Sequence, residues 1–214
     1  MVIRLGTRAS ALALAQSAMV AELITKVTGQ QVKLVRITTP GDTQTASVQQ
    51  LGVGVFASAL RDALYAQEID VAVHSYKDLP TAPAEGLTVV AVPPREDPRD
   101  ALITGNGRKL SELPPGTRVG TGAPRRIAQL RALGLGLNIV PIRGNVDTRI
   151  DKVFSGELDA VVLAQAGLNR LGRGDEVTEV IDPLVMLPAP AQGALAIECR
   201  TGEALFDELR VLDD

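Results

Sequence analysis

The stretch Arg118–Ser155 decides the fold class, and it reads RVGTGAPRRIAQLRALGLGLNIVPIRGNVDTRIDKVFS. A short apolar run at Arg118–Thr121 leads into a helical pattern at Pro124–Leu133. A second run at Asn138–Ile142 leads into another helical pattern at Val146–Ser155. Alternation of this kind is typical of βα units with buried, largely parallel strands. The sequence therefore predicts an α/β fold.

The same alternation continues in both directions along the chain. We expect further strands at Val2–Leu5, Val32–Thr38, Ile69–His74, Leu87–Val92 and Ala160–Leu163. We expect further helices at Ser10–Thr28, Phe56–Ala66 and Ala164–Arg170.

Two proline-rich segments, Val92–Asp100 and Leu187–Gly193, interrupt this alternation. We interpret them as paired crossings between two domains. Residues 1–94 and 192–214 would then form one discontinuous α/β domain, and residues 95–191 a second one, with a hinged cleft between them.

The composition excludes several classes of function. The 214 residues carry a formal net charge of -3 and only 2% aromatic side chains. A chain without a basic field or stacking platforms is poorly suited to nucleic acid or anionic membranes. One cysteine and one histidine rule out an internal disulfide and give no zinc-site pattern. We therefore expect a cytoplasmic protein with no metal.

The N-terminus allows two interpretations. Arg4 and Arg8 with the apolar run Ala9–Ala21 resemble a secretory signal peptide. Alternatively, Ser10 is a helix N-cap and Gly29 a helix stop, so that one amphipathic helix fills the interval. We favour the helix, and no other segment is long and apolar enough to span a membrane.

Arginines recur where a predicted strand gives way to a helix, the edge at which open α/β sheets bind ligands. In Leu5–Ser10, Arg8 and the free N–H groups of the helix that begins at Ser10 could face one anion. A capped helix beside a solvated arginine is the alternative.

The second junction, Val119–Arg126, is glycine-rich around Thr121 and has Pro124 at the first helical position. Arg125 and Arg126 follow in the first turn, where the helix dipole disfavours cations. This placement indicates an anion beside them, with a merely solvated pair as the alternative.

The third junction, Ile142–Arg149, has Asn145 as N-cap and Asp147 in the first turn, with Arg143 and Arg149 on either side. Asp147 could simply pair with a nearby arginine. Three such junctions predict a ligand that carries several carboxylates or phosphates.

A fourth feature is the apolar strand in Val71–Pro80, which ends in polar groups. Asp78 is the best acid/base candidate there, able to stabilise a developing cation or to pass protons to an amine or pyrrole nitrogen, with Lys77 beside it as an anion contact. A salt-bridged loop aspartate is the alternative. We interpret His74 as a structural histidine.

Two other features carry less chemistry. Cys199 closes an apolar strand and has no activating partner in sequence, so we interpret it as structural. Gly52–Phe56 lacks the lysine of a P-loop and the spacing of a dinucleotide fingerprint, and we expect a flexible lid or a tight turn there.

Taken together, the motifs resemble the porphobilinogen deaminase (hydroxymethylbilane synthase) family from Ile3 to about Arg210. The resemblance lies in Gly6–Ser10, Ala72–Pro80, Arg95–Ala101, Arg143–Arg149, Ala166–Gly172 and Gln192–Ala194. It implies two domains like those of type II periplasmic binding proteins. It also implies a monomeric transferase of tetrapyrrole (heme) biosynthesis that joins four porphobilinogen molecules to hydroxymethylbilane, releases ammonia, and uses a covalent dipyrromethane cofactor as primer.

The resemblance also assigns roles to residues. Asp78 would be the catalytic carboxylate. The acetate and propionate groups of substrate and cofactor would be held by Arg8, Ser10, Lys77, Thr121, Arg125, Arg126, Arg143, Arg149 and Arg170. Backbone or hinge contacts would come from Ser75, Gly144, Asn145, Gln192 and Gly193.

The departures from the family pattern leave two hypotheses open. The family has a third domain whose loop cysteine attaches the cofactor, whereas this sequence stops at Asp214 and Cys199 is not that cysteine. Gly122–Ala123 replaces the usual Ser–Ser pair, Val53 replaces a lysine, and Ala9 a frequent glycine. The chain is then either a deaminase fragment, inactive alone, or a non-catalytic binding protein for porphobilinogen or another polycarboxylate. The predicted N-terminal strand argues against a third possibility, an unrelated periplasmic receptor.

Overall fold

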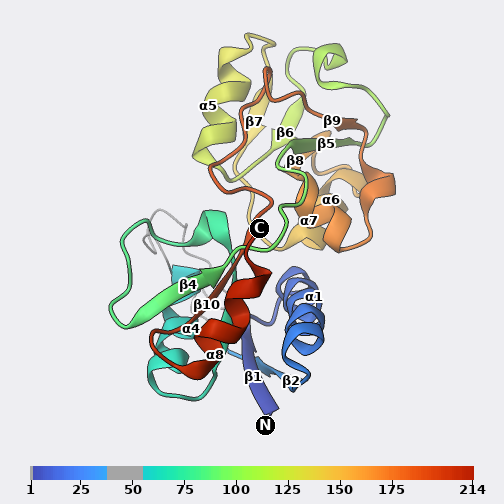
Figure 1. Cartoon of the computed structure of the whole chain (residues 1–214). Helices are drawn as coiled ribbons and strands as arrows, with labels where there is room; N and C mark the ends of the chain where they lie inside the picture. Colours follow the sequence, from blue (N-terminus) through green and yellow to red (C-terminus); the bar gives the residue numbers. More distant parts are fainter. Residues whose placement is uncertain (1, 38–54) are drawn as a thin grey trace. The chain divides into compact units, whose positions relative to one another are not determined.

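The structure, a computed structural model, describes residues 2–37 and 55–214 (Figure 1). The chain divides into two compact units, each built around a five-stranded sheet. Unit 1 comprises Met1–Arg95 and Ala194–Asp214, and unit 2 comprises Glu96–Gly193. We predicted a lid or a turn at Gly52–Phe56; residues 52–54 lie outside the described residues, and Val55 and Phe56 begin helix α4.

Unit 1 has its strands in the order β2-β1-β3-β10-β4. Their bounds are β1 Val2–Thr7, β2 Gln31–Arg36, β3 Val71–Ser75, β4 Leu87–Ala91 and β10 Leu195–Arg200. The helices are α1 Ala11–Thr28, α4 Val55–Tyr65 and α8 Ala204–Leu209, with short 3-10 turns η1 at Tyr76–Asp78 and η4 at Arg210–Leu212.

Helices cover both faces of the unit 1 sheet, because its strands carry apolar side chains on both sides. Val20 and Ile24 of α1 pack with Val71 and Val73 on one face. On the other face, Leu60 and Leu64 of α4 pack against Ala72, which lies between those two valines. The alternation along β3 thus feeds two cores from one buried strand.

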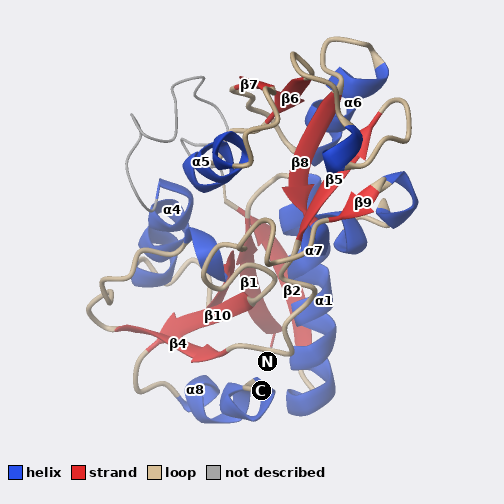
Figure 2. Cartoon of the chain, turned by 90° about the horizontal axis from the view of Figure 1, so that it is seen from above, coloured by secondary structure: helices blue, strands red, loops and turns tan. Residues whose placement is uncertain are grey.

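Unit 2 has its strands in the order β7-β6-β8-β5-β9. Their bounds are β5 Asp100–Thr104, β6 Arg118–Gly120, β7 Asn138–Val140, β8 Ala160–Ala164 and β9 Glu179–Val180. The helices are α5 Pro124–Ala132, α6 Val146–Phe154 and α7 Gln165–Arg170, with 3-10 turns η2 at Leu110–Glu112 and η3 at Gly174–Glu176. Figure 2 shows β8 and β5 side by side, as their antiparallel pairing requires.

The faces of the unit 2 sheet are covered in the same way. Leu130 of α5 packs with Val119 and Val162 on one face. Ile150 of α6 and Leu168 of α7 pack on the other. Each unit is therefore a layered α/β structure in which the polar residues at the strand ends are held by buried strands.

The structure adds three elements that the sequence patterns did not predict: β5, β9 and α8. The prediction of largely parallel sheets is corrected: both sheets are mixed, because β10 runs antiparallel to β3 and β4, and β5 antiparallel to β8 and β9. These two reversed strands are the first strand in each unit after the chain passes from the other unit. Neither follows a helical crossover within its own sheet, which is the connection that makes neighbouring strands parallel.

Helix α1 is the one described helix that passes the length and hydropathy criteria for a membrane span. The predicted ends of this helix are confirmed: Ser10 is its N-cap, and Gly29, in a left-handed conformation, is its C-cap. Val20 and Ile24 are fully buried against the unit 1 sheet. In this structure the apolar face of α1 is therefore partly used for core packing.

Candidate functional site

A pocket in unit 1 lies where two neighbouring parallel strands end. Strands β1 and β3 pair in parallel, so that the residues following both of them meet at one edge of the sheet. The pocket is lined by Arg8, Ala13, Gln16, Ala57, Leu60, Val73, His74, Ser75 and Asp78. Three of the residues predicted for binding or catalysis, Arg8, Ser75 and Asp78, are thus brought together.

The N-terminus of α1 forms one side of this pocket, and its hydroxyl groups are used internally. Ser10 Oγ accepts a hydrogen bond from the Ala13 backbone N–H at 3.3 Å. The buried Thr7 hydroxyl donates to the Ala13 carbonyl at 3.1 Å. Farther along the helix, Gln16 Nε2 donates to Ser75 Oγ at 3.1 Å and so ties α1 to the end of β3. The predicted residue Ser10 therefore serves as the cap of α1.

Asp78 reaches the pocket from η1, the single turn that follows β3. Leu79 N–H donates to the Tyr76 carbonyl at 3.1 Å and closes this turn, which leaves Asp78 and Lys77 exposed. Within the described part of the chain, the Asp78 carboxylate has no hydrogen bond or ion pair. The salt-bridged alternative for Asp78 thus has no partner among these residues, and its carboxylate is available to a ligand.

A buried charge network lies behind the pocket. Glu198 of β10 accepts hydrogen bonds from Arg61 Nη2 at 2.8 Å and from Arg61 Nε at 3.1 Å. Its other carboxylate oxygen lies 3.0 Å from His74 Nε2. Burial raises the pKa of Glu198, but the hydrogen bonds from His74 and Arg61 outweigh it and hold that pKa below its ordinary value. His74 is therefore a paired, buried residue that joins β3 to β10.

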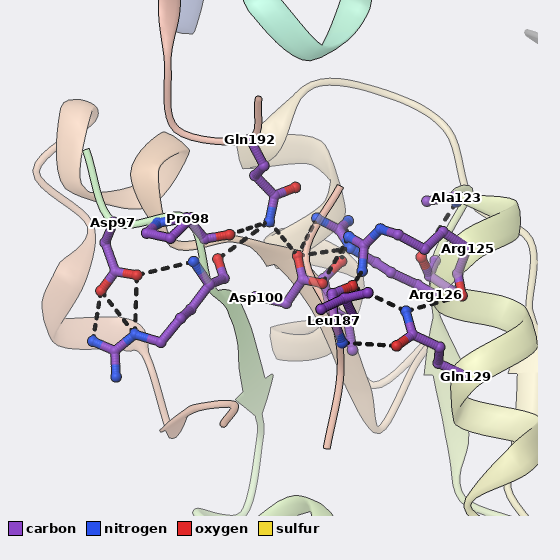
Figure 3. A network of polar contacts seen from close by, with 12 residues as sticks. Asp97, Pro98, Asp100, Ala123, Arg125, Arg126, Gln129, Leu187 and Gln192 are labelled. Carbon is purple, nitrogen blue, oxygen red and sulfur yellow. Dashed lines mark hydrogen bonds and ion pairs between the residues drawn. The ribbon is translucent and has the colours of Figure 1, made fainter. Parts of the chain in front are cut away.

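In unit 2 the paired arginines of α5 share an internal carboxylate, Asp100 (Figure 3). Arg126 donates to Asp100 Oδ1 from Nε at 3.1 Å and from Nη2 at 2.8 Å. Arg125 donates from Nη2 to Oδ2 at 2.7 Å. Gln192 Nε2 adds a third hydrogen bond to Oδ1 at 2.8 Å. Because Asp100 is fully buried, it supplies the anion that two cations in the first turn of α5 require.

Asp100 and Arg126 shift each other's pKa. Burial raises the pKa of Asp100, but the charge and hydrogen bonds of Arg126, with those of Gln192 and Arg125, leave it lowered overall. Burial lowers the pKa of Arg126, which Asp100 partly restores. Asp100 is thus held ionised.

A third arginine, Arg149, lies in the field of this pair. Its Nε donates to the Gly144 carbonyl at 2.8 Å. Burial lowers its pKa, and the neighbouring positive charges of Arg126 and Arg143 lower it further. A site with repelling guanidinium groups is stabilised by a bound anion.

The loop before α6 is built by local caps. Asn145 Oδ1 accepts from the Thr148 backbone N–H at 2.9 Å, as predicted for an N-cap. Asp147 pairs with Arg173, a residue that the sequence analysis had not singled out. Asp147 is therefore paired with Arg173, and Arg143 and Arg149 interact with other groups.

Arg170, Gln192 and Gly193 meet in the segment that leads out of unit 2. Arg170 Nη2 donates to the Gly193 carbonyl at 2.6 Å, while its buried Nε has no hydrogen-bond partner among residues 2–37 and 55–214. Burial lowers the pKa of Arg170, and Glu96 raises it in part. Gly193 has a φ of 91°, and a Cβ there would lie 2.2 Å from the Glu96 carbonyl oxygen. Only glycine fits this close approach.

In Thr121–Ala123, the segment before the paired arginines, Gly122 and Ala123 stand where the family usually has two serines. Thr121 is buried, and its Oγ1 accepts from the Ala123 N–H at 3.4 Å. A Cβ at Gly122 would lie 2.6 Å from the Ile142 carbonyl oxygen. A serine at this position would therefore require the loop to move away from Ile142.

Cys199 is buried inside β10, as its place in an apolar strand predicted. Burial raises the pKa of its thiol to about 11, with Glu203 contributing. The thiolate is therefore scarce at neutral pH, and this cysteine is unsuited to nucleophilic chemistry. Nor do residues 2–37 and 55–214 hold any cluster of three or more His, Cys, Asp or Glu side chains that could bind a metal ion.

The sequence analysis missed Asp100, Glu198 and Arg61. One signal was present for the two acids: Asp100 opens the apolar run Ala101–Ile103, and Glu198 interrupts another between Ile197 and Cys199. A charged residue in such a run must be paired when the strand is buried. Arg61 carried no such signal, because its partner lies 137 residues away in sequence.

The sequence was compared with known families and proteins. The family described as "Porphobilinogen deaminase, dipyromethane cofactor binding domain" matches residues 3–208. The porphobilinogen deaminase of Nocardia farcinica is 58% identical over 213 residues, which are 99% of this chain and 61% of that protein. Porphobilinogen deaminase 1 of Streptomyces coelicolor is 60% identical over 218 residues, 99% of this chain and 68% of that protein. The chain thus spans 61% to 68% of the length of these two relatives.

The structure is similar to those of solute-binding proteins. The methionine-binding protein MetQ has a TM-score of 0.61 at 13% identity, covering 99% of this chain and 89% of that chain. A periplasmic substrate-binding protein from Coxiella burnetii has a TM-score of 0.61 at 11% identity, covering 98% and 91%. At such identities the likeness concerns the fold alone. It confirms the predicted α/β fold of type II periplasmic binding proteins.

Proposed function

The chain belongs to the porphobilinogen deaminase family, and we propose that it carries the substrate-binding and catalytic residues of a hydroxymethylbilane synthase. In this reaction four porphobilinogen molecules are joined head to tail, and each addition releases ammonia. The observation that carries the proposal is the Asp78 carboxylate, exposed at the end of β3 in the pocket of unit 1.

Asp78 acts on the pyrrole and on the departing amine. As the amino group leaves as ammonia, positive charge develops on the pyrrole nitrogen of the substrate. A carboxylate within hydrogen-bond reach stabilises that charge and accepts a hydrogen bond from the pyrrole N–H. Because Asp78 has no ion pair within the described residues, no internal cation has to be displaced first.

The basic residues bind the acetate and propionate groups. In unit 1, Arg8 lines the same pocket as Asp78, and Lys77 is its neighbour on η1. In unit 2, the binding arginines are Arg125, Arg143, Arg149 and Arg170, and Arg126, which is held by Asp100, adds its positive charge to them. Support comes from the lowered pKa of Arg149, caused by burial and by the charges of Arg126 and Arg143, because a carboxylate would relieve that repulsion.

The dipyrromethane group of the family fits these residues in part. Its carboxylates would be held by Arg125 and Arg149, while the Thr121 hydroxyl already accepts a hydrogen bond from the Ala123 N–H. When bound, it supplies the pyrrole position that accepts the first substrate unit. Its attachment does not fit Cys199, the one cysteine of the sequence, because that thiol is buried with a pKa of about 11. We infer that the 214-residue chain by itself does not sustain turnover. By family resemblance we also infer a monomer that acts in the cytoplasm.

Porphobilinogen consumption and ammonia release test the proposal directly. Because the 214-residue chain alone is expected not to turn over, the assay compares the protein as it occurs in its native source with the D78N variant of that protein. D97N serves as the control, because Asp97 pairs with Arg99. We expect D78N to lose turnover by about 10²- to 10⁴-fold while porphobilinogen still binds. Full activity in D78N would refute the assignment.

A second function is favoured by one observation, the packing of Gly122 against the Ile142 carbonyl. The hydroxyl groups that the family usually places before the paired arginines are absent, so that the chain could bind porphobilinogen or another small polycarboxylate without turnover. Isothermal titration with porphobilinogen, alongside the ammonia assay on the same preparation, separates the two. Tight binding without ammonia release in a preparation that also carries the covalent cofactor would support the binding function.

A further inference from the structure

The two neighbouring arginines of α5 differ in exposure. The Arg126 side chain is 6% exposed, whereas that of Arg125 is 23% exposed. Both contact Asp100, but through different oxygens. The pair is therefore divided into an inner and an outer guanidinium group.

Arg126 is committed to the interior of unit 2. Its Nε and Nη2 both donate to Asp100 Oδ1, and its Nη1 donates to the Val162 carbonyl at 3.0 Å. These contacts join α5 to β5 and β8. Moving Arg126 to a ligand would remove two hydrogen bonds from the buried Asp100 carboxylate and one from the Val162 carbonyl.

Arg125 makes a different second contact. Its Nη2 is held by Asp100 Oδ2, while its Nη1 donates to the backbone carbonyl of Leu187. Leu187 belongs to the segment Leu187–Gly193 that leads out of unit 2, and its side chain is among the exposed apolar groups. Arg125 thus clamps this segment to α5 (Figure 3).

Gln129 holds the same backbone group independently. Its Nε2 donates to the Leu187 carbonyl at 3.1 Å, and its Oε1 accepts from the Leu187 N–H at 2.7 Å. If Arg125 withdraws Nη1, the Leu187 carbonyl keeps a donor. Arg125 also keeps its hydrogen bond to Asp100, so that no buried polar atom is left without a partner.

The exchange also has a favourable direction. A carboxylate is a stronger acceptor for a guanidinium group than a neutral carbonyl, because both partners are then charged and the contact can be bidentate. Arg125 and Arg126 share a single carboxylate in Asp100, and Arg149 adds further positive charge to the field. These three arginines, with only one internal carboxylate, therefore attract an anion to Arg125, the more exposed of the α5 pair.

We propose that the Leu187 carbonyl is a place-holder: it occupies the position at Arg125 Nη1 that a ligand carboxylate takes when it binds. Binding of that carboxylate then breaks the contact between Arg125 and Leu187 and releases the segment Leu187–Gly193. Asp100 is the positioning residue that keeps the guanidinium group of Arg125 in place during the exchange. The inference rests on the proposed function only in requiring a ligand that carries carboxylates.

Hydrogen exchange of peptides that cover residues 184–193 tests the release. Porphobilinogen is the probe, and its diester, which lacks the negative charges, is the matched control. We expect porphobilinogen to raise the exchange rate of the segment several-fold, and the diester to leave it unchanged. Binding of porphobilinogen without any change in exchange would overturn the proposal.

Two variants separate the clamp from the anion contact. R125Q should show fast exchange without ligand, no further change with porphobilinogen, and an affinity at least about tenfold weaker, which corresponds to one lost charge-assisted contact. Q129A should also exchange faster but keep its affinity, because Gln129 contacts Leu187 and the Arg125 backbone carbonyl but not the Arg125 guanidinium group. Unchanged affinity in R125Q, or an equal loss of affinity in Q129A, would contradict the proposal.

A second probe distinguishes this proposal from the proposed function. Citrate carries several carboxylates and no pyrrole. If porphobilinogen fails to bind but citrate accelerates exchange in the wild type and not in R125Q, the substrate assignment fails and the place-holder stands. If neither anion accelerates exchange, the place-holder itself is refuted.

Discussion

Asp78 and Asp100 both lie next to or at one end of a buried strand, but their exposure and their partners are opposite. Asp78 follows β3 on an exposed turn and has no ion pair within the described residues. Asp100 opens β5, is fully buried, and receives hydrogen bonds from Arg125, Arg126 and Gln192. Position relative to a strand is therefore not enough to identify a catalytic carboxylate.

The difference follows from desolvation. A carboxylate that leaves water loses hydration worth several kcal/mol and must recover it from fixed donors, as Asp100 does. A carboxylate at the surface keeps its hydration and can offer both oxygens to a ligand. Unit 1 thus leaves the Asp78 carboxylate exposed to water, whereas in unit 2 the buried Asp100 carboxylate holds Arg125 and Arg126 in place.

The largest expected effect on the free energy of unfolding comes from D100N. The substitution leaves Arg126 buried without its counterion, so that we expect a loss of about 3 to 5 kcal/mol in urea denaturation. D97N is the control, since Asp97 also pairs with an arginine in the same segment but both partners are partly exposed. An effect of D100N no larger than that of D97N would remove the distinction between the two aspartates.

The same comparison predicts a pH dependence. The folded-state pKa of Asp100 lies below its ordinary value, so that its contribution to stability is present above the unfolded-state pKa of about 4. That contribution is lost as the pH falls through the folded-state pKa. The stability gap between wild type and D100N should therefore shrink on acidification below about pH 4. A gap that widens there would show that the sign of the shift is wrong.

E198Q should have the next largest effect. Glu198 is buried like Asp100, but its arginine partner, Arg61, is more exposed than Arg126. We expect a loss of about 1.5 to 3 kcal/mol in urea denaturation, the range for hydrogen bonds to charged groups. E203Q is the control, because Glu203 also pairs with an arginine, Arg200, but is only partly buried. Equal effects of the two variants would mean that the network behind the pocket adds nothing.

S10A should lower stability by about 1 kcal/mol, because Ser10 Oγ caps α1. S10G should lower it by only a few tenths of a kcal/mol, since glycine is itself a good N-cap residue. Thermal denaturation of the two variants measures the difference. A neutral S10A variant would indicate that the hydroxyl serves a ligand and not the helix.

D78N should have the smallest effect on stability, less than about 0.5 kcal/mol, because no described residue depends on Asp78. The same variant has the large effect on turnover described under the proposed function. A loss of stability close to that of D100N would place Asp78 in the internal framework and overturn the contrast between the two aspartates.

Local signals in the sequence predicted most of the secondary structure. The strand–helix alternation in Arg118–Ser155 yields β6, α5, β7 and α6 within a few residues. Ser10, Asn145 and Pro124 begin their helices as predicted, because capping depends on neighbours in sequence. Strand β5 was missed because the proline-rich segment before it resembled a linker up to Asp100.

The candidate site was predicted less completely. The sequence placed Arg125 and Arg126 beside an anion, since two cations in a first turn need one. It could not identify that anion as Asp100, 25 and 26 residues earlier in the chain. Nor could it find the Leu187 carbonyl, because a backbone group carries no signature in the sequence.

The sequence by itself determined the α/β class, the helix caps and the residues that follow β1 and β3, because these depend on periodicity and on neighbours a few residues apart. Only the tertiary structure decided which charges are buried and which are exposed. That decision depends on partners such as Glu198 and His74, 124 residues apart, which strand pairing brings within 3.0 Å. Burial then fixes the outcome, since a charge removed from water must be paired and one left in water is available to a ligand.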